Sequence, residues 1–292
     1  MEEKKVVLIT GGAMGQGRAH AYKYAENGFN VVLADMLDPS LEAFKETIAS
    51  CEAKGAKVLA KKANITSTED MEALFASVWE TFGRLDVVIA NAGIINFGYT
   101  WELTDEQVEK VMDINLIGTW RTDKYATKYM LKQGFGRIIN ISSTSGLYGT
   151  PQLATYCMSK WGILGLTKTL AKEVGSKGII VNALCPTKVK TPMCETMDYV
   201  KFINDLTGKD FKSVEEMYAG VPFLEVEDIA SMVYWLGTSR EAGKFNGQGV
   251  PLDSFLKILM NCFLKDVLHE HLYNHLKQKN TLYYQYHVFL HL

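Results

Sequence analysis

Ser143, Tyr156 and Lys160 are the residues whose types and spacing best suit acid–base chemistry. Tyr156 and Lys160 are four positions apart in a segment of helical periodicity, so their side chains share one helix face. Ser143 follows a β-branched run that predicts a strand. Lys160 as an ammonium favours the Tyr156 phenolate, and lowering a tyrosine pKa by about three units takes roughly 4 kcal/mol. Such a hydroxyl can exchange a proton with a substrate.

A glycine-rich turn, Thr10-Gly11-Gly12-Ala13-Met14-Gly15-Gln16-Gly17, follows the first apolar run. Glycines let the backbone turn tightly and approach a pyrophosphate, whose charge meets the N-terminus of the next helix. The spacing is Gly-x-x-x-Gly-x-Gly rather than the Gly-x-Gly-x-x-Gly fingerprint. A tight turn with no ligand also uses glycine, but the position directly after the first strand favours a dinucleotide site.

Asp35 ends the second predicted strand. A carboxylate at this place can accept both hydroxyls of an adenosine ribose and repels a 2′-phosphate. Met36 and Leu37 follow it, and Met14 brings no positive charge from the glycine turn. The alternative is an aspartate that only caps the next turn. The pattern favours NAD over NADP.

Short apolar runs alternate with amphipathic stretches over the first 190 residues, and these elements must position the residues above. The strands are predicted at 6–9, 30–34, 56–60, 85–90, 137–141, 179–184 and 248–252. The helices are predicted at 18–27, 40–54, 68–82, 104–133, 155–174 and 226–236. This alternation predicts an α/β fold with a doubly wound parallel sheet and right-handed crossovers, a Rossmann fold. Without repeats or low-complexity linkers, residues 1–253 are predicted to form one domain.

Residues 191–222 interrupt this rhythm as a polar and aromatic insertion. An insertion after a late strand falls at the carboxyl edge of the sheet, where ligands bind. With Leu147 and Tyr148 across from it, the insertion suits a hydrophobic, ring-shaped substrate. Alternatively, its apolar residues pack the insertion's own helices. Those residues are Met193, Met197, Tyr199, Phe202, Tyr218 and Phe223.

Residues 254–292 form a C-terminal extension of different composition. Apolar residues recur in it at helical spacing, which predicts an amphipathic helix that packs on the domain or on a neighbouring subunit. An extension without a selected role is the alternative. His271 and His275 share a helix face, but no carboxylate or cysteine completes a ligand set, so no metal is predicted.

Composition excludes several classes of function. The chain has 292 residues and a net charge of −2, which gives no electrostatic footprint for nucleic acid or an anionic membrane. No apolar run approaches the ~20 residues that span a bilayer, and the N-terminus lacks a signal-peptide core. Five cysteines without a Cys-x-x-Cys spacing indicate reduced thiols. A cytoplasmic protein is expected.

With these motifs in order, the chain resembles the short-chain dehydrogenase/reductase family, in its single-domain subtype. The likeness spans about residues 4–253 and adds further motifs to the glycine turn and to Tyr156-x-x-x-Lys160. They are Asn91-Ala92-Gly93, Asn115 in Met-Asp-Ile-Asn-Leu, and Cys185-Pro186 leading to Thr191-Pro192-Met193. The segment from Gly15 to His20 looks like the carveol-dehydrogenase-like branch.

The resemblance implies a role for each matching residue. Ser143 would orient the substrate oxygen, Tyr156 would be the acid/base, Lys160 would hold the nicotinamide ribose, and Asn115 would anchor a water beside Lys160. The implied NAD-binding residues are Gly11, Met14, Gly15, Gly17, Asp35, Asn64, Ile65, Asn91, Ala92, Gly93, Tyr156, Lys160, Pro186, Val189 and Thr191. The substrate-binding residues are Ser143, Leu147, Tyr148, Tyr156, Met193 and Met197.

Four positions depart from the family's commoner residues, and one of them is Ala90, where Asn is frequent. Asn64 stands where Asp is frequent, Thr187 replaces Gly, and Gln16 replaces Ile. The Asn64 carbonyl is still expected to accept from the adenine amino group, whereas Thr187 alters the backbone beside the nicotinamide.

The sequence therefore predicts an NAD-dependent oxidoreductase that interconverts a hydrophobic secondary alcohol and its ketone, such as a hydroxysteroid or a terpenoid alcohol. The resemblance also implies a homo-oligomer, a dimer or tetramer. A dinucleotide-binding sensor or scaffold is the alternative, and intact Ser143, Tyr156 and Lys160 argue against it. An epimerase or dehydratase would show a different glycine turn and a larger C-terminal domain.

Overall fold

A computed structural model describes residues 3–253, in which seven parallel strands form one sheet of order β3-β2-β1-β4-β5-β6-β7. The strands are β1 (Val6–Thr10), β2 (Asn30–Asp35), β3 (Val58–Lys62), β4 (Val87–Ala90), β5 (Gly136–Ile141), β6 (Ile179–Pro186) and β7 (Gly249–Leu252). Val7 and Ile9 of β1 pack on one face while Val6 and Leu8 pack on the other. Burial on both faces explains the continuous apolar runs.

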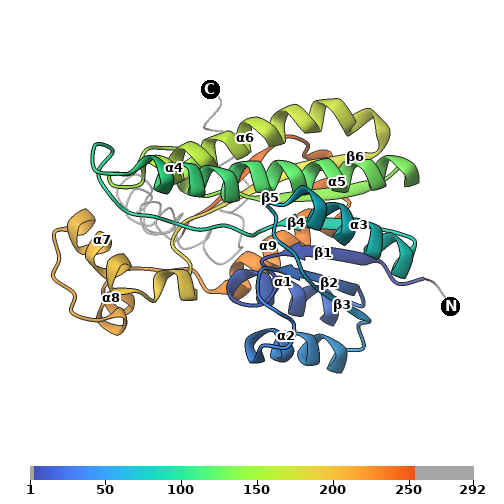
Figure 1. Cartoon of the computed structure of the whole chain (residues 1–292), viewed down its shortest axis with the longest axis horizontal. Helices are drawn as coiled ribbons and strands as arrows, with labels where there is room; N and C mark the ends of the chain where they lie inside the picture. The colour runs from blue at the N-terminus through green and yellow to red at the C-terminus, as the bar shows by residue number, and fades with distance from the viewer. Residues whose placement is uncertain (1–2, 254–292) are drawn as a thin grey trace, which may run out of the picture. The chain divides into compact units, whose positions relative to one another are not determined.

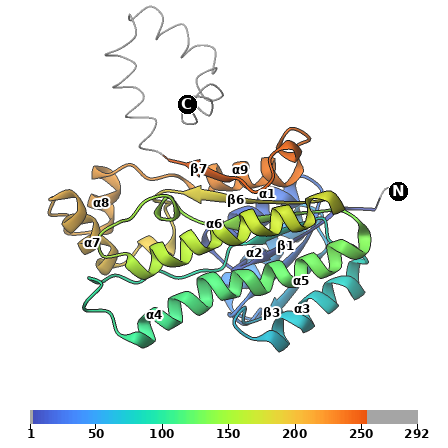
Figure 2. The ribbon, with the colours of Figure 1, turned by 90° about the horizontal axis from the view of Figure 1, so that it is seen from above.

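Helices cover both faces of the sheet (Figures 1 and 2). One face carries α1 (Gly15–Glu26), α2 (Glu42–Ala53) and α9 (Val226–Thr238). The other carries α3 (Thr68–Phe82), α5 (Gly118–Gln133) and α6 (Ala154–Val174), with α4 (Asp105–Met112) leading into α5. The predicted doubly wound parallel sheet is confirmed.

The chain order of the strands reverses between β1 and β4, which are neighbours at the centre of the sheet. Ligands of open α/β sheets bind outside the carboxyl ends of the strands at such a switch point. The glycine turn follows β1, Asn91 follows β4 and Ser143 follows β5. The topology therefore brings these three segments to one edge of the sheet.

Some element boundaries differ from the prediction. The expected helix over 104–133 is divided into α4 and α5 by a π-helical turn, Asp113–Ile117. A π-helical turn of five residues is too short to give a period of its own in the apolar pattern, so periodicity does not reveal it. Helix α1 begins at Gly15 rather than at residue 18. The sequence placed the start too late because the first turn contains Gly15 and Gly17, and glycine has a low helix propensity. Strand β3 lies two residues later than predicted, beyond the left-handed Gly55.

The insertion forms two short helices, α7 (Met197–Thr207) and α8 (Val214–Gly220), which lie beside one another at one end of the sheet (Figure 1). A bridge between Val189 and Leu224 joins the two ends of this segment. The predicted amphipathic helix and the histidine pair of residues 254–292 lie outside the described residues. Among residues 3–253, no helix combines the length and the apolar character that crossing a bilayer requires.

Candidate active site

The glycine turn between β1 and α1 has a backbone that only glycine fits. Gly11 and Gly15 have φ angles of +65° and +55°, in the left-handed region. A Cβ on Gly17 would lie 1.9 Å from the Gly11 carbonyl oxygen. Met14 precedes α1 in an extended conformation and makes no side-chain cap hydrogen bond. The helix N-terminus is thus left without a side-chain cap, as an anion-binding turn requires.

Asp35, at the end of β2, accepts hydrogen bonds from the glycine turn and from the turn that follows β2. Its Oδ2 accepts a hydrogen bond from Ala13 N at 3.0 Å, and its Oδ1 accepts one from Leu37 N at 3.1 Å. Each carboxylate oxygen retains a further lone pair, so capping and ribose binding are compatible. Arg18, a cation beside the turn, is held by the Ala13 and Ala43 carbonyls and by the Glu46 carboxylate.

Asn91 joins the ends of β1 and β4. Its Nδ2 donates to the carbonyls of Thr10 at 2.9 Å and Gly11 at 3.2 Å. In return, Thr10 Oγ1 accepts from the backbone N–H groups of Asn91 and Ala92 at 3.0 and 3.2 Å. These bonds fix the floor of the crevice at the switch point. A Cβ on Gly93 would meet Asn115 Oδ1 at 3.2 Å and Lys160 Nζ at 3.7 Å, so Gly93 borders two of the predicted catalytic residues.

Asn64 and Ile65 follow β3. Asn64 Oδ1 accepts from Thr66 N and from Thr66 Oγ1, both at 3.0 Å. These bonds occupy both lone pairs of that oxygen, so the expected acceptance from an adenine amino group is not supported. Ile65 is buried against the start of α5, where a Cβ on Gly118 would lie 2.6 Å from Ile65 Cδ1.

Asn115 lies in the π-helical turn and is fully buried. Its Oδ1 accepts from Ile94 N at 2.8 Å and its Nδ2 donates to Ile94 O at 2.9 Å. Nδ2 also donates to Ser159 Oγ at 3.2 Å, next to Lys160 on α6. The turn thus links the segment after β4 to the helix that carries Tyr156 and Lys160.

Ser143, Tyr156 and Lys160 meet as predicted. Lys160 is 4% exposed, and its Nζ donates to Ile141 O at 2.8 Å and lies 5.4 Å from the Tyr156 ring centroid. A hydrogen bond connects the hydroxyls of Tyr156 and Ser143. Ser143 Oγ also accepts from Ser145 N at 3.1 Å and lies 3.4 Å from Pro186 O, so its single hydrogen is shared between Pro186 O and the Tyr156 oxygen.

The pKa of Tyr156 is not lowered in this structure, contrary to the sequence prediction. Burial raises the pKa of Tyr156 to about 12, against a lowering contribution from the Ser143 hydrogen bond. Burial also lowers the pKa of Lys160 to about 8. The cause is shared, because a low-dielectric site disfavours both phenolate and ammonium. Tyr156 is consequently a phenol that can donate a proton at neutral pH.

A cavity opens among these groups. Its lining consists of Gln16, Asn91, Gly93, Ile141, Ser142, Ser143, Tyr156, Lys160, Pro186, Thr187 and Met193. Gln16 Oε1 is buried without a hydrogen-bond partner in the described part of the chain. Prediction missed Gln16, Thr187, Ile141 and Ser142 as lining residues. For Gln16 and Thr187, the sequence feature that could have identified them as lining residues was their departure from the commoner residues of the family.

The predicted substrate residues divide into two groups. Tyr199 and Phe202 are buried in a cluster with Val200, Ile203 and Met217, so they pack the insertion itself. Leu147, Tyr148, Met193 and Met197 are 37%, 51%, 38% and 59% exposed. This second group, the exposed apolar set, is available to a ligand.

Thr191 begins the insertion above the glycine turn. It is buried, and its Cβ would lie 3.8 Å from a Cβ on Gly15. Val189 is also buried and pairs with Leu224. The segment after β6 therefore closes against the predicted pyrophosphate site. Among residues 3–253, no group of three or more His, Cys, Asp or Glu side chains is placed to hold a metal ion.

Comparison with known proteins agrees with this geometry. The short chain dehydrogenase family model matches residues 5–199. An uncharacterised NAD-dependent oxidoreductase of Mycobacterium tuberculosis is 36% identical over 85% of this chain and 94% of that protein. A (−)-trans-carveol dehydrogenase of Rhodococcus erythropolis is 34% identical over 86% of this chain and 97% of that protein.

Solved structures show the same relationship. Carveol dehydrogenase from Mycobacterium avium in complex with NAD has a TM-score of 0.81 at 27% identity, covering 87% of this chain and 97% of that one. Levodione reductase has a TM-score of 0.78 at 32% identity, covering 88% and 98%. NAD as the cofactor is thereby confirmed. The chain belongs to the short-chain dehydrogenase family, is carveol-dehydrogenase-like, and is an NAD-dependent oxidoreductase of alcohols and ketones.

Proposed function

We propose that the substrate is a hydrophobic cyclic secondary alcohol or its ketone, of the hydroxysteroid or terpenoid class. The observation that carries this proposal is the exposed apolar set, Leu147, Tyr148, Met193 and Met197, of which Met193 also lines the cavity of Tyr156. Apolar walls around a few polar groups are typical of sites for hydrophobic ligands. Carveol, in the names of two similar proteins, is an alcohol of this class.

The cofactor fits the residues at the carboxyl edge. Gly11, Met14, Gly15 and Gly17 would receive the pyrophosphate at the uncapped start of α1, and Asp35 would accept the adenosine ribose hydroxyls. Gln16 Oε1, which is buried and has no hydrogen-bond partner within residues 3–253, is a polar atom of this site. Asn64, Ile65, Asn91, Ala92 and Gly93 would line the adenosine side, and Pro186, Val189 and Thr191 the nicotinamide side. NAD supplies the hydride acceptor of the reaction.

The chain's own residues handle the proton. Ser143, whose hydroxyl is fixed by Pro186 O and Ser145 N, orients the substrate oxygen beside Tyr156. The Tyr156 phenol gives its proton to the carbonyl oxygen during reduction, and the Tyr156 phenolate takes the proton of the alcohol during oxidation. Lys160 lies beside the Tyr156 ring, and its ammonium form would favour the phenolate that reduction leaves behind. Asn115 holds Ile94 and Ser159 around the buried path by which Lys160 exchanges protons with solvent.

A substrate panel tests the proposal. Purified protein with NAD is assayed by the absorbance of NADH against hydroxysteroids, cyclic terpenoid alcohols and short acyclic alcohols. We expect kcat/KM to be at least roughly tenfold higher for the cyclic hydrophobic alcohols, because each tenfold corresponds to about 1.4 kcal/mol of added contact. A matched Met193→Ser variant should lose most of this preference. Equal kcat/KM for acyclic alcohols would contradict the substrate class, and NAD binding without turnover would favour a sensor.

We also propose that the protein forms a homo-oligomer through α5 and α6. Four large apolar side chains here are 39% to 54% exposed: Ile117 just before α5, Trp120 on α5, and Met158 and Trp161 on α6. Large apolar side chains exposed together indicate a contact surface. Light scattering of the wild type and of Trp161→Glu is expected to show a mass reduced to the monomer in the variant. A monomeric wild type would contradict the proposal.

A further inference from the structure

Asp123 on α5 is a buried carboxyl that has no role in the site described above. It is 1% exposed and faces β5 and α6. Asn140 Nδ2 donates to Asp123 Oδ2 at 2.9 Å and to Thr167 Oγ1 on α6 at 3.0 Å. We call Asp123, Asn140 and Thr167 the polar clasp. Its three elements continue into the proposed catalytic residues: α5 from the turn of Asn115, β5 toward Ser143, and α6 from Tyr156 and Lys160.

The polar clasp lacks one hydrogen-bond donor. Both Nδ2 hydrogens of Asn140 are used, and the Thr167 hydroxyl donates to Ile163 O at 2.8 Å. Two buried oxygens, Asp123 Oδ1 and Asn140 Oδ1, have no partner within residues 3–253. A buried acceptor without a donor is costly. One additional proton between these oxygens would satisfy both.

Within residues 3–253, no cation forms an ion pair with Asp123. Lys160 of α6 donates to Ile141 O, and Arg137 of β5 donates to Leu236 O and Ser239 O on the opposite face of the sheet. The charges of Glu69 and Glu72 on α3 raise the pKa of Tyr125, and Arg121 of α5 forms an ion pair with Asp113.

Burial therefore raises the pKa of Asp123 to about 7, and the Asn140 hydrogen bond lowers it by less. This direction is that of a carboxyl which keeps its proton below about pH 7.

We propose that Asp123 is a protonated carboxylic acid whose Oδ1–H donates to Asn140 Oδ1, and that this acid–amide pair positions the catalytic residues. Asn140 precedes Ile141, whose carbonyl oxygen accepts a hydrogen bond from Lys160 Nζ at 2.8 Å. The same strand, β5, leads to Ser143. A second bond across the Asp123–Asn140 pair fixes β5 against α5, while Thr167 fixes α6. Asp123 is thus a positioning residue, a role that rests on the proposed function of Ser143, Tyr156 and Lys160.

Asp123→Asn tests the protonation without reference to activity. An asparagine offers an N–H to Asn140 Oδ1 and a carbonyl to Asn140 Nδ2, so it reproduces the protonated acid but cannot ionise. In the wild type, the unfolded aspartate ionises at about 3.9 and the folded one near 7. Stability relative to the variant is therefore lost as pH rises through this window.

The measurement is urea unfolding of both full-length proteins from pH 5 to pH 9. The ratio of their unfolding constants, wild type over variant, should grow about tenfold per pH unit between pH 5 and 7 and level off above. Asp210→Asn, at a side chain that is 78% exposed, is the matched control and should give a constant ratio. A constant ratio for Asp123→Asn as well would overturn the proposal. The infrared band of a protonated carboxyl, lost in Asp123→Asn, is a second readout.

Asp123→Ala tests the positioning. We expect kcat to fall roughly tenfold with the Kd for NAD unchanged, because a small misplacement of reacting groups slows the chemical step, and Asp123→Asn should restore kcat. If Asp123→Ala does not fold, Thr167→Val removes one bond of the polar clasp and should lower kcat in the same direction. Wild-type kcat in the variant that folds, or equal loss in Asp123→Asn, would contradict positioning. An inactive wild type would contradict only the proposed function, since the unfolding ratio is independent of turnover.

Discussion

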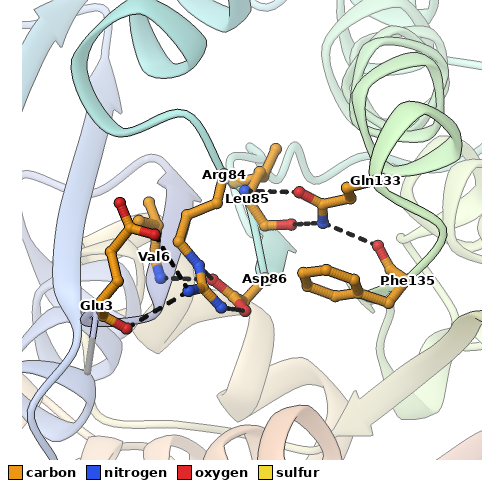
Figure 3. A network of polar contacts seen from close by, with 7 residues as sticks. All are labelled: Glu3, Val6, Arg84, Leu85, Asp86, Gln133 and Phe135. Carbon is orange, nitrogen blue, oxygen red and sulfur yellow. Dashed lines mark hydrogen bonds and ion pairs between the residues drawn. The ribbon is translucent and has the colours of Figure 1, made fainter.

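At the amino edge of the sheet, Asp86 accepts hydrogen bonds from Val6 N at 2.8 Å and from Arg84 Nε and Nη2 at 2.9 and 2.7 Å (Figure 3). Gln133 exchanges bonds with the backbone of Leu85 and donates to Phe135 O in the same network. At the carboxyl edge, Ser143, Tyr156 and Lys160 instead present polar atoms to a cavity, and Gln16 Oε1 has no partner in the described chain.

The difference between the two edges separates stability from function. Partnered polar groups at the amino edge tie β1, β4 and the end of α5 together, so their loss should weaken the fold. Polar groups that face a cavity contribute less to folding and are available to ligands. Substitutions at the amino edge should therefore lower the free energy of unfolding and leave turnover unchanged. Substitutions at the carboxyl edge should lower turnover or NAD binding and leave the free energy of unfolding nearly unchanged.

Replacing Gly17 by Ala should give the largest effect on the carboxyl edge. The new Cβ would lie 1.9 Å from Gly11 O, so the glycine turn must move away from α1. We expect NAD affinity to fall at least roughly 100-fold, about 2.7 kcal/mol, in a fluorescence titration. Gly165→Ala on α6, where a Cβ meets no atom within 4 Å, is the control and should bind NAD normally. Unchanged affinity in Gly17→Ala would show that the turn does not hold the pyrophosphate.

Asp86→Ala tests the amino edge. The substitution removes the acceptor of Val6 N and of Arg84, and hydrogen bonds to charged groups contribute about 1.5–3 kcal/mol. The free energy of unfolding should fall by about 2–3 kcal/mol in urea titrations, while kcat of the folded protein stays at the wild-type value. If Asp86→Ala instead kept the wild-type free energy of unfolding and lost most of its kcat, the amino edge would serve catalysis rather than stability, which would contradict the account.

Asp35→Ala sharpens the comparison, because Asp35 both caps a turn and faces the adenosine site. Removing its charge should improve the use of NADP, and the ratio of kcat/KM for NAD over NADP should narrow on the order of tenfold. Asp35→Asn separates the two roles, since it keeps an acceptor for Ala13 N at 3.0 Å without the charge. A wild type that works better with NADP than with NAD would contradict the assignment.

The pH dependence of the reaction follows from the raised pKa of Tyr156, about 12. Alcohol oxidation needs the phenolate, whose fraction grows with pH, whereas ketone reduction needs the phenol, which predominates at neutral pH. Between pH 7 and 8, kcat/KM for oxidation should rise several-fold, to roughly tenfold at most, while that for reduction changes little. Oxidation rates that fall over this range would exclude Tyr156 as the base.

Strand ends were predictable because each apolar run is buried on both faces of the sheet, and parallel strands place their carboxyl ends together. That reasoning placed the glycine turn, Asp35 and Ser143 at strand ends, whereas Asn91 was implied by the family resemblance. It did not reveal the π-helical turn of Asn115, because five residues are too few to give a period of their own in the apolar pattern. Whether Tyr199 faces a ligand or a neighbouring helix also depends on tertiary packing.

Titration behaviour was least accessible from sequence. Spacing alone brings Lys160 beside Tyr156, but burial of both groups decides the direction of their pKa shifts. Asp123 is similar, because a charged residue in an amphipathic helix reads as a surface residue. Its burial becomes visible only when β5 and α6 pack against α5.

Tyr156→Phe tests most directly the claim that the carboxyl edge performs the chemistry and contributes little to stability. The substitution keeps the ring and removes only the hydroxyl that exchanges the proton. Turnover with NAD and the best alcohol should fall by roughly 10²-fold or more, on the scale of general acid–base catalysis, while NAD affinity and the free energy of unfolding stay near wild-type values. Near-wild-type turnover in this variant would contradict the account.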